Sequence, residues 1–246
     1  MGTLTEIVDV DAPGGRMPLF VCRPDGEGPY PAALVLMEPF GVNAHLRSVA
    51  RRLAAEGYLA AAPDLYYRRE ERNVPYANAD RAADLVMRTI ALGDAPEERV
   101  KDERVFADIR AAVSALEVHP KVDPDHIGAV GFCMGARLAF LSACRLSDAL
   151  RVAVCFYPLS LLPILREARE LRAPLLMLVG GKDRDLPLPH VDRIQAELAY
   201  LGKTHEVKIY PGAAHGFFCE EQLAYHPEAA RDAWSLTLGW LTKHLR

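Results

Sequence analysis

A cysteine between two glycines, placed where a strand-like segment turns into a helix-like one, constrains the fold of this chain most. The run Gly131-Phe132-Cys133-Met134-Gly135 follows the apolar segment 127–130 and precedes the helix-like segment 136–144. Such a turn strains its central residue, and a Cβ on either flank would collide with the strand or the helix. Because N–H groups and the helix dipole at a helix start favour a thiolate, the pattern predicts an exposed, reactive cysteine. The alternative is a buried cysteine that packs as a small apolar residue.

Two more residues follow in the order that a catalytic triad of this kind requires. Asp183 comes just after the apolar run 175–179, and His215 comes just after the strand-like run 206–210. Open parallel sheets place their sites at the carboxyl ends of strands, and α/β-hydrolases have the order nucleophile, acid, histidine. We therefore predict an α/β-hydrolase fold, with a mostly parallel central sheet and helices on both faces. Asp183 would orient His215, which would serve Cys133 as base and later as acid.

Each triad partner has an alternative explanation. An aspartate after Gly180-Gly181 is often only a turn residue, and Asp185 is a nearby competitor. His215 stands apart from the other histidines because its loop of glycine and alanine follows a strand. We expect the remaining seven to be solvated or to cap helices: His45, His119, His126, His190, His205, His226 and His244.

From about residue 6 to residue 245 the chain resembles the dienelactone hydrolases, also called carboxymethylenebutenolidases. The resemblance rests on five motifs: Glu38-Pro39-Phe40-Gly41-Val42-Asn43, Pro63-Asp64-Leu65-Tyr66, Gly131-Phe132-Cys133-Met134-Gly135, Gly180-Gly181-Lys182-Asp183 and His215-Gly216-Phe217. It implies a cysteine-dependent hydrolase of small carboxylic esters or lactones that works through a thioester. It also implies catalytic roles for Cys133, Asp183 and His215, a small-molecule substrate, and no metal or cofactor.

Glu38 ends the apolar run 32–37, where an acid is either a titrating partner or a solvated rim residue. The resemblance implies that it lies near the resting thiol and controls its ionisation. The Met134 amide would be one oxyanion donor in this family. The residue after the glutamate would supply the other, but here it is Pro39, which has no N–H. Either the Phe40 or Gly41 amide substitutes, or the second donor is missing.

The expected substrate contacts depart from the family pattern in one place. The family holds a substrate carboxylate with two arginines, and the position four residues after the catalytic histidine is Cys219 here. Arg81 matches the other arginine, although the segment 68–94 aligns loosely and Arg69, Arg72 or Arg88 could serve instead. We expect Phe40, Tyr157 and Phe217 to complete the substrate site.

Composition and charge exclude several other classes. Strands and helices alternate through all 246 residues without a polar linker, which predicts one domain over 1–246. A net charge of −4 without a basic stripe argues against nucleic-acid or anionic-membrane partners. The first residues contain no export or acylation signal, and the apolar run 152–165 is too short to span a bilayer and is broken by Pro158 and Pro163. The sequence leaves the oligomeric state and the natural substrate open.

Five cysteines without paired spacing indicate a reducing compartment, hence a cytoplasmic location, and give no zinc motif. Cys22, Cys144 and Cys155 lie in apolar segments and are expected in the core. Two rival functions remain: a catalytically silent member that binds a small ligand, and a thiol redox sensor with Cys219 as the resolving partner of Cys133.

A coarse reading of the elements positions these motifs. Strands near 5–10 and 19–22 would form a hairpin through the turn 13–15, and further strands would cover 32–37 and 58–62. Helices are predicted over 44–55, 98–117, 189–201 and 227–245. The last helix would bury a face with Ala230, Trp234, Leu238 and Leu241. The polar segment 68–94 would be either a lid over the pocket or a solvated loop.

Overall fold

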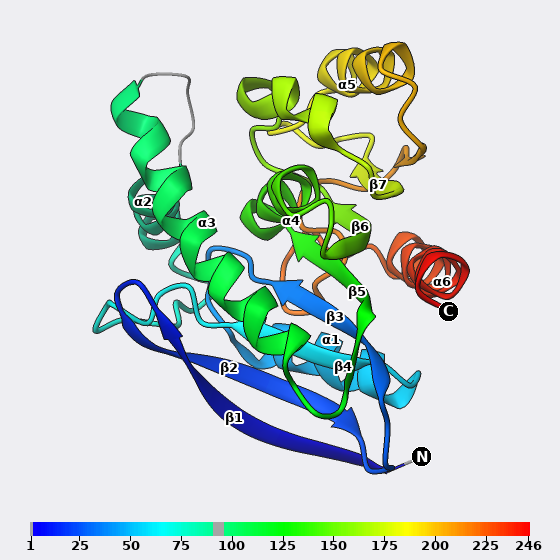
Figure 1. Cartoon of the computed structure of the whole chain (residues 1–246). Helices are drawn as coiled ribbons and strands as arrows, with labels where there is room; N and C mark the ends of the chain where they lie inside the picture. Colours follow the sequence, from blue (N-terminus) through cyan, green and yellow to red (C-terminus); the bar gives the residue numbers. More distant parts are fainter. Residues whose placement is uncertain (1, 91–95) are drawn as a thin grey trace. The chain divides into compact units, whose positions relative to one another are not determined.

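The structure is a computed structural model that describes residues 2–90 and 96–246. It divides into two compact units, Met1–Gly128 and Ala129–Arg246, and β5 (Val122–Phe132) begins in the first and ends in the second. Each unit combines strands with helices, which confirms the α/β class (Figure 1). The single domain expected over 1–246 remains a prediction.

The first unit contains an antiparallel hairpin followed by a parallel strand pair. The hairpin strands β1 (Thr3–Ala12) and β2 (Gly15–Pro24) pair from Thr3 with Pro24 to Ala12 with Gly15. Strand β2 also runs antiparallel to β4 (Leu59–Pro63), which in turn runs parallel to β3 (Tyr30–Leu36). Gly15 has φ +118°, a left-handed value that the tight turn requires and that glycine adopts readily. The predicted hairpin is confirmed.

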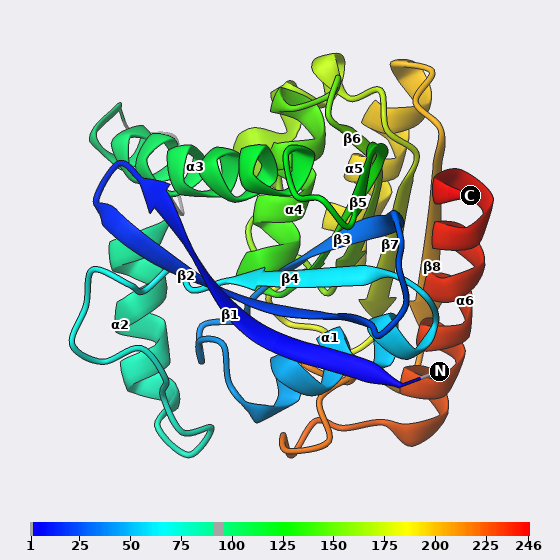
Figure 2. The ribbon, with the colours of Figure 1, turned by 60° about the horizontal axis from the view of Figure 1, so that its bottom comes forward.

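Helices α1 (Ala44–Ala55), α2 (Ala79–Thr89) and α3 (Pro96–Glu117) complete the first unit. Figure 2 shows α1 and α3 on opposite sides of the strands of this unit. The Asn43 side chain accepts a hydrogen bond from the Leu46 N–H at 3.0 Å and so caps α1. Gly57, at φ +92°, ends the same helix in the left-handed conformation. The predicted bounds of this helix are confirmed.

The second unit is built on three parallel strands, β6 (Leu150–Phe156), β7 (Leu175–Gly180) and β8 (His205–Tyr210), in that order. Every residue of β7 is buried. The helical elements of this unit are α4 (Met134–Arg145), η1 (Leu162–Glu170), α5 (Leu188–Tyr200) and α6 (Pro227–Leu245). Helices α4 and α6 both pack on β6, and they lie on opposite sides of it in Figure 1.

Two sequence expectations need correction. The run 152–165 contains most of β6 and the start of η1, and neither had been predicted as an element. Trp234 is only partly buried, whereas Trp240 and Thr237 lie on the buried face of α6. The face is rotated because the small residues Ala230 and Ala233, rather than the large Trp234, allow close approach to the strands.

The polar segment 68–94 contains α2, and its last residues lie outside the described part of the chain. Its role as a lid remains a prediction. Among the residues that the structure describes, no helix has the length and apolar character needed to cross a membrane.

Candidate active site

The turn between β5 and α4 has the strained geometry that the glycine pattern predicts. Cys133 has φ 53° and ψ −114°, which is a rare conformation for a residue with a side chain. A Cβ on Gly131 would lie 2.1 Å from the Gly135 carbonyl oxygen, so only glycine fits there. The Cys133 N–H donates to the Phe156 carbonyl at 3.0 Å, and its own carbonyl accepts from the Leu159 N–H at 3.2 Å. These contacts hold the turn against the end of β6.

Cys133 is more buried than the sequence predicted. Only 8% of the residue is exposed, because the segment after β6 hydrogen-bonds directly to the turn. The expectation of an exposed thiol is therefore wrong.

His215 and Asp183 meet through adjacent loops that follow β8 and β7. His215 Nδ1 lies 2.9 Å from Asp183 Oδ2, and the Asp183 side chain is fully buried. Asp183 Oδ1 accepts the N–H groups of Asp185 and Leu186 at 2.9 and 3.1 Å. The competitor Asp185 lies farther from Nδ1, at 3.7 Å, and its side chain is 56% exposed. Asp183 is thus the carboxylate that is fixed against the imidazole.

Two glycines bring these loops together. A Cβ on Gly180 would lie 2.6 Å from the Ala213 carbonyl oxygen, and one on Gly181 would lie 2.7 Å from Pro211 Cα. The Lys182 N–H donates to the Ala213 carbonyl at 2.8 Å. The glycines before Asp183 therefore permit the close approach of the loop that contains His215.

The charge state of His215 depends on both of its neighbours. Burial lowers the pKa of His215, but the negative charge of Cys133 and the Asp183 carboxylate raise it, and the net pKa lies well above the ordinary value. His215 Nε2, the ring atom not used by Asp183, is buried and forms no hydrogen bond of regular geometry with any described residue. The raised pKa favours the imidazolium form of His215.

Tyr157 packs on the imidazole from the end of β6. Its ring lies edge-on to His215 at 5.1 Å between centroids, and to Phe217 at 5.3 Å. The Tyr157 backbone has φ 38°, and its N–H donates to the Leu178 carbonyl at 2.8 Å. Tyr157 therefore fixes the position of the His215 ring.

The sequence reasoning missed Arg137, which lies one helical turn after Cys133. Its side chain is fully buried in α4, and its guanidinium donates a hydrogen bond to the Ser160 carbonyl. Ser160 has φ 50°, so Arg137 supports a strained segment next to the elbow. The spacing of four residues from Cys133 was the available signal, but a charged residue is normally expected at the surface.

Comparison with known proteins decides the family. The model of the dienelactone hydrolase family matches residues 17–245. The chain belongs to the dienelactone hydrolase family. A Yersinia pestis protein named "Putative carboxymethylenebutenolidase" is 32% identical over 245 residues, which cover 96% of this chain and 86% of that protein. A Bradyrhizobium protein named "Probable 2-oxo-3-(5-oxofuran-2-ylidene)propanoate lactonase" is 32% identical over 97% of this chain and 94% of its own length.

A solved structure agrees with this assignment. The crystal structure of a protein named "Putative Dienelactone Hydrolase" from Klebsiella pneumoniae subsp. pneumoniae MGH 78578 has a TM-score of 0.88 and 31% identity. The match covers 99% of this chain and 100% of that one. This dienelactone hydrolase family member therefore has the predicted α/β-hydrolase fold, and it is a hydrolase.

Glu38, the acid expected from the family resemblance, is buried in the first unit. It is 4% exposed, and the Tyr76 hydroxyl donates to its Oε2 at 3.4 Å. The interpretation of Glu38 as a solvated rim residue is therefore wrong. Its relation to the thiol remains a prediction.

The amides after Glu38 differ in their availability as oxyanion donors. The Gly41 N–H donates to the Glu38 carbonyl at 3.2 Å, so it is already used. The Phe40 N–H has no acceptor within the part of the chain that the structure describes. The Met134 N–H, the first of α4, likewise has no described acceptor, as is usual at a helix start. Of the two substitutes for Pro39, Phe40 is the one favoured.

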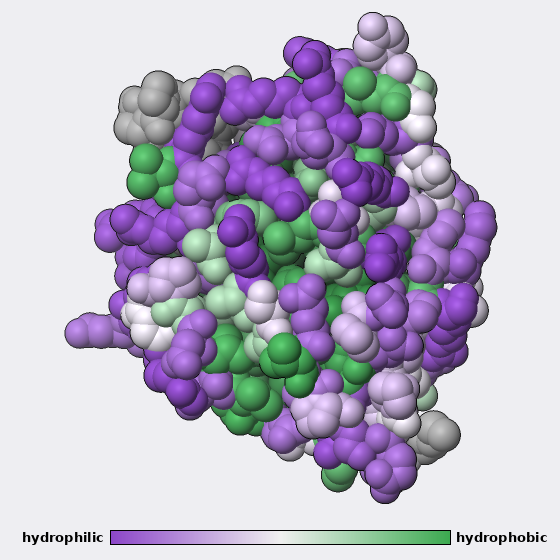
Figure 3. All heavy atoms as spheres, viewed as in Figure 1, coloured by the Kyte–Doolittle hydropathy of each residue, from purple (hydrophilic) through white to green (hydrophobic). Residues whose placement is uncertain are grey.

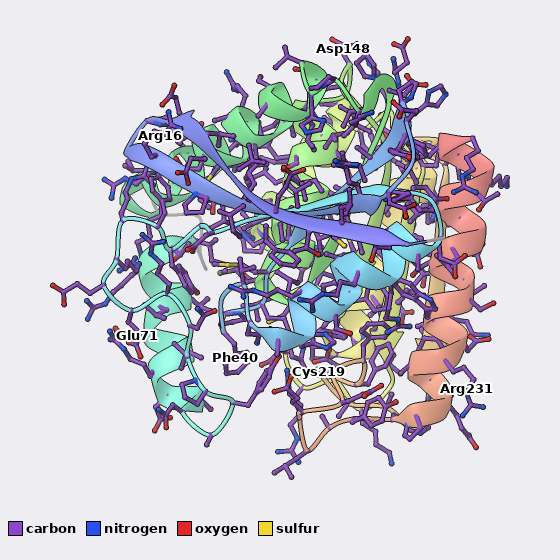
Figure 4. The ribbon with its side chains drawn as sticks, turned by 90° about the horizontal axis from the view of Figure 1, so that it is seen from below. Arg16, Phe40, Glu71, Asp148, Cys219 and Arg231 are labelled. Atoms are coloured by element: carbon purple, nitrogen blue, oxygen red, sulfur yellow. The ribbon has the colours of Figure 1, made fainter. Side chains whose placement is uncertain are left out.

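The predicted substrate residues lie in different surroundings. Arg81 pairs with Glu71 at 2.7 Å and Asp84 at 2.6 Å, and Figure 4 shows Glu71 on the outer loop before α2. Phe40 is partly buried, and the centroid of its ring lies 4.3 Å from that of the Tyr76 ring. Phe217 and Cys219 are fully buried, so they would act from the wall of a pocket. Substrate contact by these residues and Tyr157 remains a prediction.

Two of the other histidines and three of the cysteines have structural surroundings. His226 caps α6 by accepting from the Ala229 N–H at 3.3 Å. His45, expected to be solvated or capping, is instead buried, and burial together with Arg52 lowers its pKa to about 4. None of the five cysteines, all of them described, forms a disulfide, and Cys22, Cys144 and Cys155 lie in the core as predicted. Burial raises the pKa of the Cys144 and Cys155 thiols, which makes them unreactive.

Proposed function

We propose that this hydrolase opens small carboxylic esters or lactones with Cys133 as nucleophile and His215 and Asp183 as its partners. One observation supports the proposal above all others. His215 is fixed by Asp183 at 2.9 Å, while the negative charge of Cys133 raises its pKa. A buried imidazole that is fixed by a carboxylate and interacts with a cysteine at a strained elbow supports the proposal that Cys133 is the nucleophile and His215 its acid and base.

The reaction has two steps. The Cys133 thiolate attacks the carbonyl carbon, and the new oxyanion would be stabilised by the Met134 amide and the Phe40 amide. The C–O bond to the alkoxide then breaks, His215 gives that alkoxide its proton, and a thioester remains. Water next attacks the thioester while His215 accepts its proton, and the C–S bond breaks to release the acid and restore the thiolate. In a lactone the alcohol stays attached to the acyl group through both steps, so a single hydroxy acid is released.

Glu38 has the character of a residue that controls the resting thiol. It is a buried carboxylate hydrogen-bonded to Tyr76, and a carboxylate near a thiol disfavours the thiolate through like charge. We propose that Glu38 acts on Cys133 in this way.

We propose that the enzyme discriminates only weakly between a neutral substrate and one that carries a carboxylate. Cys219 replaces one of the two arginines that the family resemblance implies, and Arg81 already pairs with two carboxylates. A carboxylate on the substrate would therefore gain less than a bidentate arginine contact provides. Five described cysteines without a disulfide also suit a reducing compartment such as the cytoplasm.

Hydrolysis of a chromogenic aryl ester and of a neutral unsaturated lactone tests the proposal. Cys133→Ala should abolish turnover of both substrates with the fold intact, and Cys133→Ser should retain weak activity because an alcohol ionises far less readily. Cys144→Ala is the matched control, since that thiol is buried and unreactive. Full turnover by Cys133→Ala would refute the proposed nucleophile.

A further inference from the structure

A cavity of about 200 Å³ in the first unit is lined by an excess of positive charge. Five cationic side chains and one carboxylate line it: Arg68, Arg69, Arg88, Lys101, Arg104 and Asp108. They come from the loop after β4, the end of α2 and one face of α3. The proposed hydrolysis does not use this cavity.

Helical spacing places three of the lining residues on one face of α3. Lys101, Arg104 and Asp108 are three or four residues apart, so they share one face of α3. Figure 3 shows mostly hydrophilic side chains along this helix. The Lys101 Nζ donates to the Met87 carbonyl at 2.7 Å, which joins α3 to α2. The cationic groups are thus carried by elements that contact each other.

The single carboxylate in the wall is already neutralised. Asp108 is 1% exposed, and it accepts a bidentate pair of hydrogen bonds from Arg68, one of them at 2.8 Å. The Tyr67 hydroxyl donates to the same carboxylate at 3.0 Å, and the Arg68 guanidinium stacks over the Tyr67 ring at 4.4 Å. This network fixes Arg68 as a rigid part of the wall and leaves Asp108 no charge to offset the other cations.

The remaining cations differ in how they are held. Arg88 forms an ion pair with Asp84 at 2.8 Å. Arg69 donates to the Arg88 carbonyl at 3.3 Å, and this contact with a neutral acceptor does not compensate the charge of Arg69. Arg104 forms no hydrogen bond or ion pair with any residue in the described ranges. Like charges grouped around a cavity repel one another, and a bound anion would relieve that repulsion.

We propose that this cavity binds a small phosphate-type anion, either inorganic phosphate or the phosphate group of a metabolite. The guanidinium fork matches phosphate oxygens geometrically, and cations that approach from three elements suit a tetrahedral group better than a planar carboxylate. The cavity volume accommodates one such group with part of its substituent.

Calorimetric titration of the full chain with inorganic phosphate, pyrophosphate and malonate, at constant ionic strength, tests this site. Phosphate and pyrophosphate should bind saturably at one site, and more tightly than malonate. Arg104→Gln should weaken phosphate binding about five- to twentyfold, because it removes a charged donor that forms no hydrogen bond or ion pair among the described residues. Turnover of a neutral aryl ester should not change in this variant.

Arg231→Gln is the matched control, since it makes the same charge change on the outer face of α6 (Figure 4). It should leave phosphate affinity within about twofold of the wild type. Three results would each overturn the proposal: no saturable phosphate or pyrophosphate binding, unchanged binding in Arg104→Gln, or an equal loss in Arg231→Gln. Tighter binding of malonate than of phosphate would overturn the choice of a phosphate-type ligand. If phosphate stabilises the wild type against heat, the increase in Tm should be smaller in Arg104→Gln, and equal increases in both would also contradict the site.

Discussion

The Asp183 carboxylate lies 2.9 Å from His215 Nδ1, and the Asp183 side chain is completely buried. Its second oxygen is occupied by two backbone N–H groups, so the carboxylate has one orientation. A partner fixed at Nδ1 leaves Nε2 as the atom that would exchange protons in the proposed reaction. The pH dependence of the enzyme should therefore depend on Asp183.

Asp183→Asn should move the alkaline limb of the kcat/KM profile to lower pH. His215 must be in its protonated form to give the leaving group a proton. The raised pKa of His215 keeps the ring protonated through neutral pH. Removing the Asp183 charge removes one of the causes that raise this pKa, so deprotonation begins at lower pH. Turnover should also fall, by roughly 10²–10⁴-fold. The same titration is visible in the NMR signal of His215 Cε1–H, and an unchanged His215 titration would contradict the role of Asp183.

Gly131→Ala should destabilise the protein by roughly 2–4 kcal/mol, because its new Cβ would lie 2.1 Å from the Gly135 carbonyl oxygen. Gly239→Ala is the matched control, since a Cβ there meets nothing within 4 Å and α6 is continuous at that position. It should stabilise the helix by about 0.5–1 kcal/mol. Chemical denaturation of both variants measures the difference. Equal stabilities would show that the elbow relaxes without cost.

Glu38→Gln should change the pH dependence of the thiol more than the maximal rate. If the carboxylate lies near Cys133 as proposed, removing its charge should make alkylation of the thiol by iodoacetamide rise at lower pH. The amide retains the size of the side chain and its contact with Tyr76. Alkylation rates measured across pH for both proteins test this. Superimposable curves would mean that Glu38 does not act on the thiol.

The substrate prediction follows from Cys219. The wild type should favour a carboxylate-bearing lactone over its neutral methyl ester by less than about tenfold in kcat/KM, because one arginine of the clamp is absent. Cys219 is fully buried, so Cys219→Arg would enclose a charge without a carboxylate partner and is a poor test. Kinetics of the unmodified enzyme decide the matter. A preference of a hundredfold or more for the acid would mean that other arginines form the whole anion site.

Local chemistry made much of the fold predictable. Asn43 and Gly57 delimit α1, and Pro227 starts α6, through capping rules that depend only on neighbouring residues. Gly131 could be assigned to a close approach because a Cβ there would collide with the neighbouring helix, as the structure shows. Each of these features depends on a few neighbouring residues, so the sequence alone is enough to predict it.

What escaped prediction depends on packing between distant segments. The burial of Arg137 against the Ser160 carbonyl, and of His45 in α1, brings polar groups into positions where sequence rules expect solvent. The choice of Trp240 over Trp234 as the buried tryptophan depends on the rotation of α6 against the strands. The shielding of Cys133 likewise depends on Leu159, which is distant in sequence.

The most direct test of the central claim is the intact mass of the enzyme, quenched in acid during turnover of a slowly hydrolysed aryl ester. The account predicts a single acyl adduct that maps to the peptide with Cys133, is released by hydroxylamine as a thioester, and is absent from Cys133→Ala. It also predicts that Cys144→Ala still forms the adduct. An adduct on another residue, or undiminished turnover by Cys133→Ala without any adduct, would contradict the assignment of Cys133 as the nucleophile.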